Sequence, residues 1–247
     1  MKWTRHENIE FPQVWLKFKA KDPESGEIVN YQVEDLTEDR FDEVVGHMIN
    51  YFIPDEPMCT SLNILKDEVS MAETTEMWQE AVRKKLTLVC FKESTEGTEG
   101  TREICALNIL EVNEKEDGTG DVLQSLKGNA MRDIFTVFSF LKHRADVFNR
   151  YNVDKYLHGL GLLTLPKYRG CGLATEVLKA RFPLMEALGL TLTCTVFSGP
   201  GSQGAARKAN FTEDFVAPYE SLGTQQPFVK FPNISWPVVK FMCYQLK

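Results

Sequence analysis

Three residues with a clear chemical use, Arg169, Gly170 and Gly172, stand in the stretch PKYRGCGLATEVLKA (Pro166–Ala180). An apolar segment typical of a strand precedes the stretch, and a helical pattern follows it. Glycine weakens a helix interior by about 1 kcal/mol relative to alanine, so two glycines at a helix start need a reason. The first N–H groups of a helix are unpaired and carry partial positive charge, which stabilises a phosphate. The turn therefore predicts a diphosphate site, to which Arg169 adds a charge.

The spacing of the turn separates it from the two commonest phosphate loops. It lacks the GxxxxGK[ST] spacing, and it is not GxGxxG because Thr175 occupies the third glycine position. It matches [Q/R]-x-x-G-x-[G/A] through Arg169, Gly172 and Ala174. In this it resembles the acyl-CoA pyrophosphate motif of the GNAT superfamily of N-acetyltransferases. The alternative is a glycine-rich turn between a strand and a helix that binds no ligand.

A narrower resemblance rests on three pieces of the chain: PDEPMCT (Pro54–Thr60), LTLPKYRGCGLA (Leu163–Ala174) and FSGPGSQ (Phe197–Gln203). Together they resemble the insect arylalkylamine N-acetyltransferases, over a region from about residue 28 to the end. The chain departs from the superfamily pattern at two places. Asn210 replaces a glycine before Phe211, and asparagine tolerates the left-handed conformation of a helix C-cap. Ala206 stands where many members have a general-acid tyrosine, so that mechanism is not expected.

The resemblance implies acetyl-CoA as co-substrate and a set of residues that bind it. The strand end Leu163–Leu165 is expected to pair its backbone with the pantetheine arm, in a gap where two strands splay apart. A backbone N–H of this stretch is expected to polarise the thioester carbonyl. The expected cofactor-binding residues are Leu163, Thr164, Leu165, Arg169, Gly170, Cys171, Gly172, Leu173, Ala174 and Thr175.

The acidic pair Asp55 and Glu56 lies between two prolines. The resemblance places Glu56 as the general base, acting through water, and both acids at the amine substrate. The chemistry agrees, because a carboxylate in a partly dry pocket attracts an ammonium group before taking its proton. The alternative is that both are exposed loop acids.

Two serines, Ser198 and Ser202, match positions that the family uses near the thiol end of the cofactor. Either could relay a proton to the departing thiolate, so both are candidate catalytic residues. Because serine is a poor acid on its own, an orienting or CoA-contacting role is a second interpretation. Helix capping is a third, since serine is a strong N-cap residue and a short helix is expected to follow.

Two further residues have a possible but less favoured chemical role. Cys171 lies inside the turn, where a helix N-terminus lowers a thiol pKa, but the diphosphate end is far from a thioester. A covalent acyl-cysteine is therefore disfavoured. His158 could line the substrate pocket, although a lone strand histidine is more often structural.

Composition excludes some classes of function. The 247 residues carry a net charge of −7 without a dense Lys/Arg block, which disfavours nucleic-acid binding. An acidic chain suits a cationic substrate, although the charge is also explained by solubility alone. The six cysteines form no CxxC pair and the four histidines do not cluster, so we expect reduced thiols and no metal. Without a signal peptide or an apolar run of membrane-helix length, we expect a cytoplasmic monomer that binds no membrane.

Hydrophobic periodicity predicts an α/β (α+β) fold with a mixed, mostly antiparallel sheet flanked by helices. No linker is visible, so residues 1–247 are expected to form one N-acetyltransferase domain, with an N-terminal hairpin at about 12–36 and an acetyl-CoA-binding core at about 155–211. Exposed loops are expected at 93–101, 114–120 and 198–204, and a proline-rich loop at 54–60. The expected strands are 14–20, 28–36, 86–92, 103–112, 157–165, 191–197, 215–221 and 238–246. The expected helices are 37–53, 62–84, 121–148, 173–188 and 205–210.

Together these features predict an acetyl-CoA-dependent N-acetyltransferase acting by direct attack in a ternary complex. By resemblance, the acceptor is an arylalkylamine of the dopamine, serotonin, tyramine or octopamine type. Agmatine, polyamines or histamine remain an alternative acceptor class, and a longer acyl chain is not excluded. A peptide acceptor is less favoured, and a non-catalytic acyl-CoA-binding module is the alternative from another functional class.

Overall fold

The computed structural model describes residues 3–93, 102–116 and 123–246. The loop tips expected at 94–101 and 117–120, and the first two residues of the helix expected from 121, lie outside the described residues. Within the described residues, one eight-stranded sheet has the order β1-β2-β3-β4-β5-β6-β8-β7. Its strands are β1 (Val14–Lys21), β2 (Ile28–Asp35), β3 (Leu88–Lys92), β4 (Ile104–Glu114), β5 (Lys155–Thr164), β6 (Leu192–Phe197), β7 (Thr212–Pro218) and β8 (Val238–Gln245).

Neighbouring strands in this sheet are antiparallel except at one junction. The pair β5–β6 is parallel, and every other adjacent pair is antiparallel. The central strands β3 and β4 are mostly apolar and are buried over most of their length, whereas the edge strand β1 alternates between half-buried and exposed residues. This difference follows from position, because central strands are covered on both faces. The predicted mixed, mostly antiparallel sheet is confirmed.

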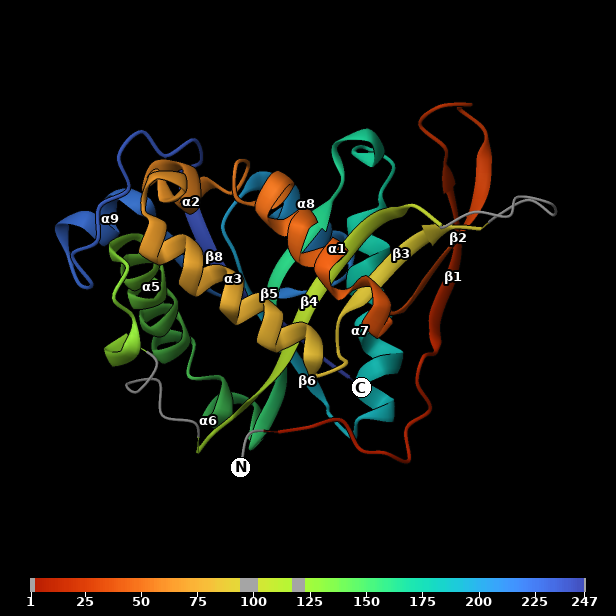
Figure 1. Cartoon of the computed structure of the whole chain (residues 1–247). Helices are drawn as coiled ribbons and strands as arrows, with labels where there is room; N and C mark the ends of the chain where they lie inside the picture. Colours follow the sequence, from red (N-terminus) through yellow and green to blue (C-terminus); the bar gives the residue numbers. More distant parts are fainter. Residues whose placement is uncertain (1–2, 94–101, 117–122, 247) are drawn as a thin grey trace.

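Helices cover both faces of the sheet. α1, α3 and α5 form one layer, while α7 packs across the strands from β1 to β6 and also contacts α8. Figure 1 shows the β1–β2 hairpin at one end of the sheet, with α5 and α9 toward the other. The α-helices are α1 (Phe41–His47), α2 (Pro57–Ser61), α3 (Glu68–Arg83), α5 (Asn129–Ala145), α6 (Val147–Tyr151), α7 (Leu173–Ala187), α8 (Pro200–Lys208) and α9 (Tyr219–Thr224). Short 3-10 turns are η1 (Glu38–Arg40), η3 (Ile64–Lys66) and η4 (Pro166–Tyr168), and η2 (Met48–Phe52) is a π-helical turn.

Two of the expected loops contain helix starts, so those predictions are wrong in part. α2 begins at Pro57 inside the expected loop 54–60, and α8 begins at Pro200 inside the expected loop 198–204. In both cases proline takes the first helical position, where its fixed φ fits and its missing N–H costs nothing. Proline thus begins these helices rather than interrupting them.

Three other expected boundaries also differ. The helix expected at 62–84 is interrupted, because Asn63 is left-handed (φ 54°) and Asp67 caps a new helix, α3. The helix expected at 121–148 begins its main part, α5, only at Asn129, and α6 follows a left-handed Asp146. The strand expected to reach Ser221 ends at Pro218, after which α9 begins.

Candidate active site

A cavity of about 790 Å³ opens where β5 and β6 separate. The two strands pair only at Leu157–Thr193 and His158–Cys194, after which β6 continues alongside β8. The predicted splay of the central parallel strands is therefore confirmed. The cavity is lined from both layers, by α3 and α5 on one side and by the starts of α7 and α8 on the other. It can therefore admit two molecules from opposite faces of the sheet.

A β-bulge shapes the wall of β5 beside the gap. Leu110 pairs with Gly159 and Ile109 with Gly161, which leaves Leu160 as the extra residue. Beyond the bulge, Leu165 N donates to Cys105 O at 3.0 Å. Hydrogen-bonded and non-bonded pairs alternate along an antiparallel ladder, so the backbone of Leu163 also faces β4. The backbone N–H and C=O groups of Leu162 and Thr164 therefore face the gap.

The glycine turn has the conformation that its sequence required. Gly170 and Gly172 have φ of 81° and 83°, which glycine adopts without strain, and a β-carbon at either would meet open space. Gly172 is the N-cap of α7, whose first turn contains Leu173, Ala174 and Thr175. These three residues, both glycines and Arg169 line the cavity. The N–H groups of the helix start thus lie at its wall, as an anion site requires, although the N–H of Thr175 also donates to Gly172 O at 3.1 Å.

Cys171 is oriented differently from its neighbours in the turn. It is not among the residues that line the cavity, and its side chain packs against the hydrophobic core. The structure therefore gives no support to an acyl-cysteine. His158 is also turned away, being 2% exposed with Nδ1 3.1 Å from Cys194 O. Burial and then the charges of Lys142 and Arg181 hold the pKa of His158 well below its usual range, which fits a neutral structural histidine.

The two acids of the proline-flanked segment have different environments. Glu56 is 8% exposed and caps α2, with Oε2 accepting from Cys59 N at 2.6 Å. Its other oxygen, Oε1, is buried and has no hydrogen-bond partner in the described part of the chain. Asp55 is exposed, and its Oδ2 lies 3.2 Å from Nη2 of Arg169. The interpretation as exposed loop acids thus fits Asp55 but not Glu56.

The two serines lie at the start of α8 without capping it. The N-cap is Gly199, which makes no side-chain cap, and Ser202 lies inside the helix with its hydroxyl donating to Gly199 O at 3.1 Å. The capping interpretation is therefore wrong. Both serines line the cavity. A β-carbon at Gly199 would lie 3.1 Å from Pro57 Cγ, so the serine segment packs directly against the segment that carries Glu56.

Tyr219 helps to fix this junction. Its hydroxyl donates to Ser198 O at 2.9 Å, and the side chain is 3% exposed. Burial and then the negative charge of Glu56 raise the pKa of Tyr219 above its usual range. Sequence reasoning missed Tyr219, because the segment was expected to be a strand.

The far side of the cavity is apolar and aromatic, and its residues were also missed. They come from the π-helical turn and from α3 and α5: Phe52, Met77, Trp78, Met131, Phe135 and Phe138. Their helical spacing is that of an ordinary core-facing stripe, so the sequence held no signal that they line a cavity. The charged lining residues are Asp55, Glu56, Arg169 and Lys208. Lys208, at the end of α8, is a second cation that the sequence analysis did not single out.

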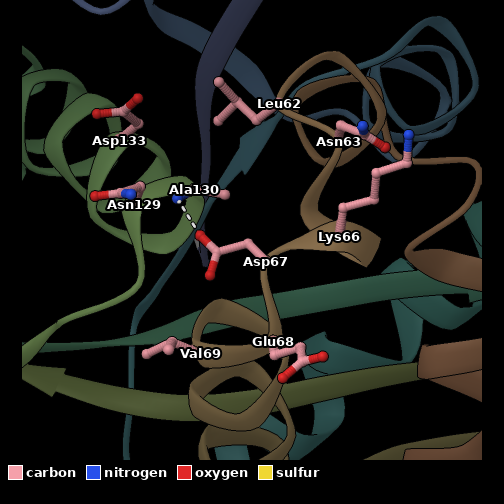
Figure 2. Close-up of a pocket in the computed structure, with 9 residues that line it drawn as sticks. All are labelled: Leu62, Asn63, Lys66, Asp67, Glu68, Val69, Asn129, Ala130 and Asp133. Carbon is pink, nitrogen blue, oxygen red and sulfur yellow. Dashed lines mark hydrogen bonds between the residues drawn. The ribbon is translucent and has the colours of Figure 1, made fainter.

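A second depression, of about 660 Å³, lies between η3, the start of α3 and the start of α5. Figure 2 shows Asp67 at its centre, directed at the backbone of Ala130. The same carboxylate accepts from Ser70 N, so it caps two helices at once. The Asp67 carboxylate is thus used for structure. No group of three or more His, Cys, Asp or Glu residues in the described ranges is placed to hold a metal ion, and no described helix is long and apolar enough to cross a membrane.

Comparison with solved structures identifies the family to which the chain belongs. The structure named arylalkylamine N-acetyltransferase 7 from the yellow fever mosquito Aedes aegypti, an assignment its name marks as unproven, is 39% identical, with all of both chains covered and a TM-score of 0.90. The chain belongs to the insect arylalkylamine N-acetyltransferase-like family of the GNAT superfamily. It is therefore an acyl-CoA N-acyltransferase by family.

More distant members of this superfamily share the fold. Arylalkylamine N-acetyltransferase 2 from Aedes aegypti is 15% identical, with 88% of this chain and 99% of that chain covered and a TM-score of 0.73. Polyamine N-acetyltransferase of Drosophila melanogaster is 15% identical, with 87% and 100% covered and a TM-score of 0.69. No family model and no curated protein sequence matches the chain.

Proposed function

We propose that this N-acyltransferase transfers an acetyl group from acetyl-CoA to the primary amine of an arylalkylamine. The observation that carries the proposal is the shape of the cavity at the β5–β6 gap. One side has the start of α7 and the cation Arg169, whereas the other is aromatic with one buried carboxylate, Glu56. Such a passage holds a polyanionic cofactor and a monocationic aromatic amine against each other.

The residues at the cofactor end fit acetyl-CoA. The N–H groups at the start of α7 and the Arg169 guanidinium would hold the diphosphate, with Lys208 as a further phosphate contact. The gap-facing backbone groups of Leu162 and Thr164 would pair with the amides of the pantetheine arm, in place of the missing β6 ladder.

Glu56 would act on the amine. Its free Oε1 is the one buried carboxylate oxygen of the cavity lining without a partner, among the described residues, and an ammonium group would satisfy it. The ammonium loses two protons during the reaction. Glu56 accepts the first, directly or through water, and passes it to solvent. The amine nitrogen then bonds to the acetyl carbon, the C–S bond breaks with its electron pair on sulfur, and the second proton reaches the sulfur, for which Ser198 or Ser202 can serve as a relay.

Charge at the acceptor side favours an aromatic monoamine over a polyamine or agmatine. A second cationic group would need its own anion, and the only carboxylates in the described lining are Asp55 and Glu56. Asp55 is exposed and already paired with Arg169. The rings of Phe52, Trp78, Phe135 and Phe138 instead offer surface to an aromatic ring.

The test is thiol release from acetyl-CoA with tyramine, dopamine, serotonin, histamine, agmatine and spermidine. We expect turnover with the first three and a loss of about 10²- to 10⁴-fold in kcat for Glu56→Gln. Glutamine keeps an oxygen that can cap α2, so the variant should fold. Turnover only with agmatine or spermidine would contradict the substrate class. Tight acetyl-CoA binding without turnover of any amine would favour a binding module.

A further inference from the structure

A buried cation lies behind the apex of the β5–β6 gap and has no role in the function proposed above. Arg181, on α7, is 0% exposed. Its Nη1 donates to the hydroxyls of Thr193 and Thr195 at 3.1 and 2.8 Å, and its Nε donates to Asn108 Oδ1 at 2.7 Å. These partners are all neutral. Its Nη2 has no partner in the described part of the chain. Arginine is almost never fully buried without a counter-charge, so the group needs an explanation.

The surroundings of Arg181 adjoin the cavity. A β-carbon at Gly159 would lie 2.5 Å from Nη2 and 2.6 Å from Thr195 Oγ1, and both Gly159 and Thr195 line the cavity. Glycine is thus required at the apex because the guanidinium lies against the backbone there. Burial lowers the pKa of Arg181 to about 9, so the group still carries its charge at neutral pH.

Asn108 connects this cation to the bulged strand. Arginine can only donate, so its bond fixes the carbonyl oxygen of the Asn108 amide toward Arg181. The amide nitrogen is then directed the other way, and Nδ2 donates to Gly161 O at 2.7 Å. Asn108 is itself 0% exposed, which leaves it little freedom to rotate.

The Gly161 carbonyl belongs to the same peptide unit as the N–H of Leu162. In a planar trans peptide the C=O and N–H groups point in opposite directions. With the oxygen held by Asn108 of β4, the Leu162 N–H points away from β4 and into the gap. The alternation of the β4–β5 ladder leads independently to the same direction. A hydrogen bond to the oxygen also polarises the peptide and makes its N–H a stronger donor.

We propose that Arg181 and Asn108 are positioning residues, which hold and polarise the Gly161–Leu162 peptide so that the Leu162 N–H donates to the thioester carbonyl oxygen. The inference rests on the proposed function, because it requires acetyl-CoA in the gap. As the amine attacks, negative charge develops on that oxygen. A fixed donor backed by a buried positive charge stabilises it without reorganisation. The role accounts for a buried arginine that would otherwise only cost stability.

Asn108→Asp is the sharpest test of this relay. The carboxylate still accepts from Arg181 Nε, and gains an ion pair, but it cannot donate to Gly161 O. We expect the variant to fold and bind acetyl-CoA, and kcat to fall about tenfold or more. The decisive readout is the infrared stretch of the thioester carbonyl in bound [1-¹³C]acetyl-CoA. Binding to the wild type should lower its frequency, and Asn108→Asp should lose most of that shift.

Two further variants complete the experiment. Val137→Ala removes buried volume in α5 away from the cavity, so it should lower stability and leave the carbonyl shift unchanged. Arg181→Lys keeps the charge but loses the Nε bond that orients Asn108, and it should lose part of the shift. If Asn108→Asp does not fold, the carbonyl shift in Arg181→Lys is the result that tests the relay. A wild-type shift retained in the relay variants, or absent from the wild type, would overturn the relay. No acetyl-CoA binding by the wild type would overturn the proposed function as well.

Discussion

Glu56 and Asp55 show how two adjacent carboxylates acquire different chemistry from their burial. The cap on α2 uses one oxygen of Glu56 and leaves the other unpartnered in a buried position, among the described residues. Asp55, one residue earlier, is exposed and bonded to the cation of the glycine turn. The first arrangement suits proton transfer, whereas the second links the acidic segment to the glycine turn.

The Asp55–Arg169 pair predicts that acetyl-CoA must compete with Asp55 for the arginine. Asp55→Asn should therefore tighten acetyl-CoA binding by up to about fivefold, since exposed ion pairs contribute about 0.2–1 kcal/mol. Isothermal titration calorimetry measures the effect. Glu43→Gln, which removes the same charge from the ion pair between Glu43 of α1 and Arg40 of η1, is the matched control and should leave the affinity unchanged. Weaker binding by Asp55→Asn would mean that Asp55 itself supports the cofactor.

His158 predicts a pH dependence of stability. Because burial holds its pKa well below about 6.5, the unfolded chain takes up a proton that the native chain does not as the pH falls below that value. The free energy of unfolding should therefore drop on acidification, with a contribution from this group of up to about 1.4 kcal/mol per pH unit. In His158→Asn, which keeps a donor for Cys194 O, urea titrations between pH 7.5 and 5 should show a shallower drop. Parallel curves for the two proteins would contradict this.

At the scale of elements, the cavity exists because β5 and β6 do not pair along their full length. β5 and β6 stop pairing after His158, and the bulge at Leu160 turns alternate backbone groups of β5 toward the opening. α7 and α8 begin at this same opening, and α3 and α5 close it from the other face. Most of the cavity wall is therefore built on regular elements, which hold it more rigidly than loops could.

The alternation along β5 predicts a residue-by-residue pattern of amide exchange. Bound acetyl-CoA should slow exchange at Leu162 and Thr164, whose N–H groups face the gap. Leu163 and Leu165, already bonded toward β4, should change little. Hydrogen exchange followed by NMR resolves the four amides. Adenosine 3′,5′-bisphosphate, which lacks the pantetheine arm, is the control ligand and should slow none of them. Equal slowing at all four would contradict the register argument.

At the scale of the whole molecule, one continuous sheet joins the N-terminal hairpin to the C-terminal strands (Figure 1). α7 reinforces this continuity, because it packs across the strands from β1 to β6. The two ends of the chain are thus coupled through shared packing, and the cavity lies within this one sheet rather than at its edge.

This continuity predicts cooperative unfolding and a global response to the cofactor. Tryptophan fluorescence and far-UV circular dichroism should report one coincident urea transition. Acetyl-CoA at about 100 times its Kd should stabilise the protein by about 2.7 kcal/mol in both signals. CoA supplied at the same multiple of its own Kd is a suitable control and should act equally. Two separate transitions, with only one moved by acetyl-CoA, would contradict the expectation of a single domain.

The sequence by itself determined the features that depend on local chemistry. Alternating and continuous apolar segments indicated the eight strands of the described residues, and Gly170 and Gly172 indicated a special turn at the start of a helix, where the structure gives both glycines a positive φ. Asn210 likewise has the positive φ (63°) expected of a helix C-cap. Local sequence was less reliable at prolines, since Pro57 and Pro200 were interpreted as loop residues although each begins a helix.

Only the tertiary structure decided which of these residues meet, because contacts between distant segments leave no local pattern. The aromatic residues of α3 and α5 have the spacing of ordinary core residues, and only the divergence of β5 from β6 makes them a cavity wall. In the sequence, nothing distinguishes Arg181 from the other cationic residues near it. Arg181 becomes a buried partner of Asn108, 73 positions away, because α7 packs on β4. Burial of Glu56 depends in the same way on the segments packed around it rather than on its neighbours in the chain.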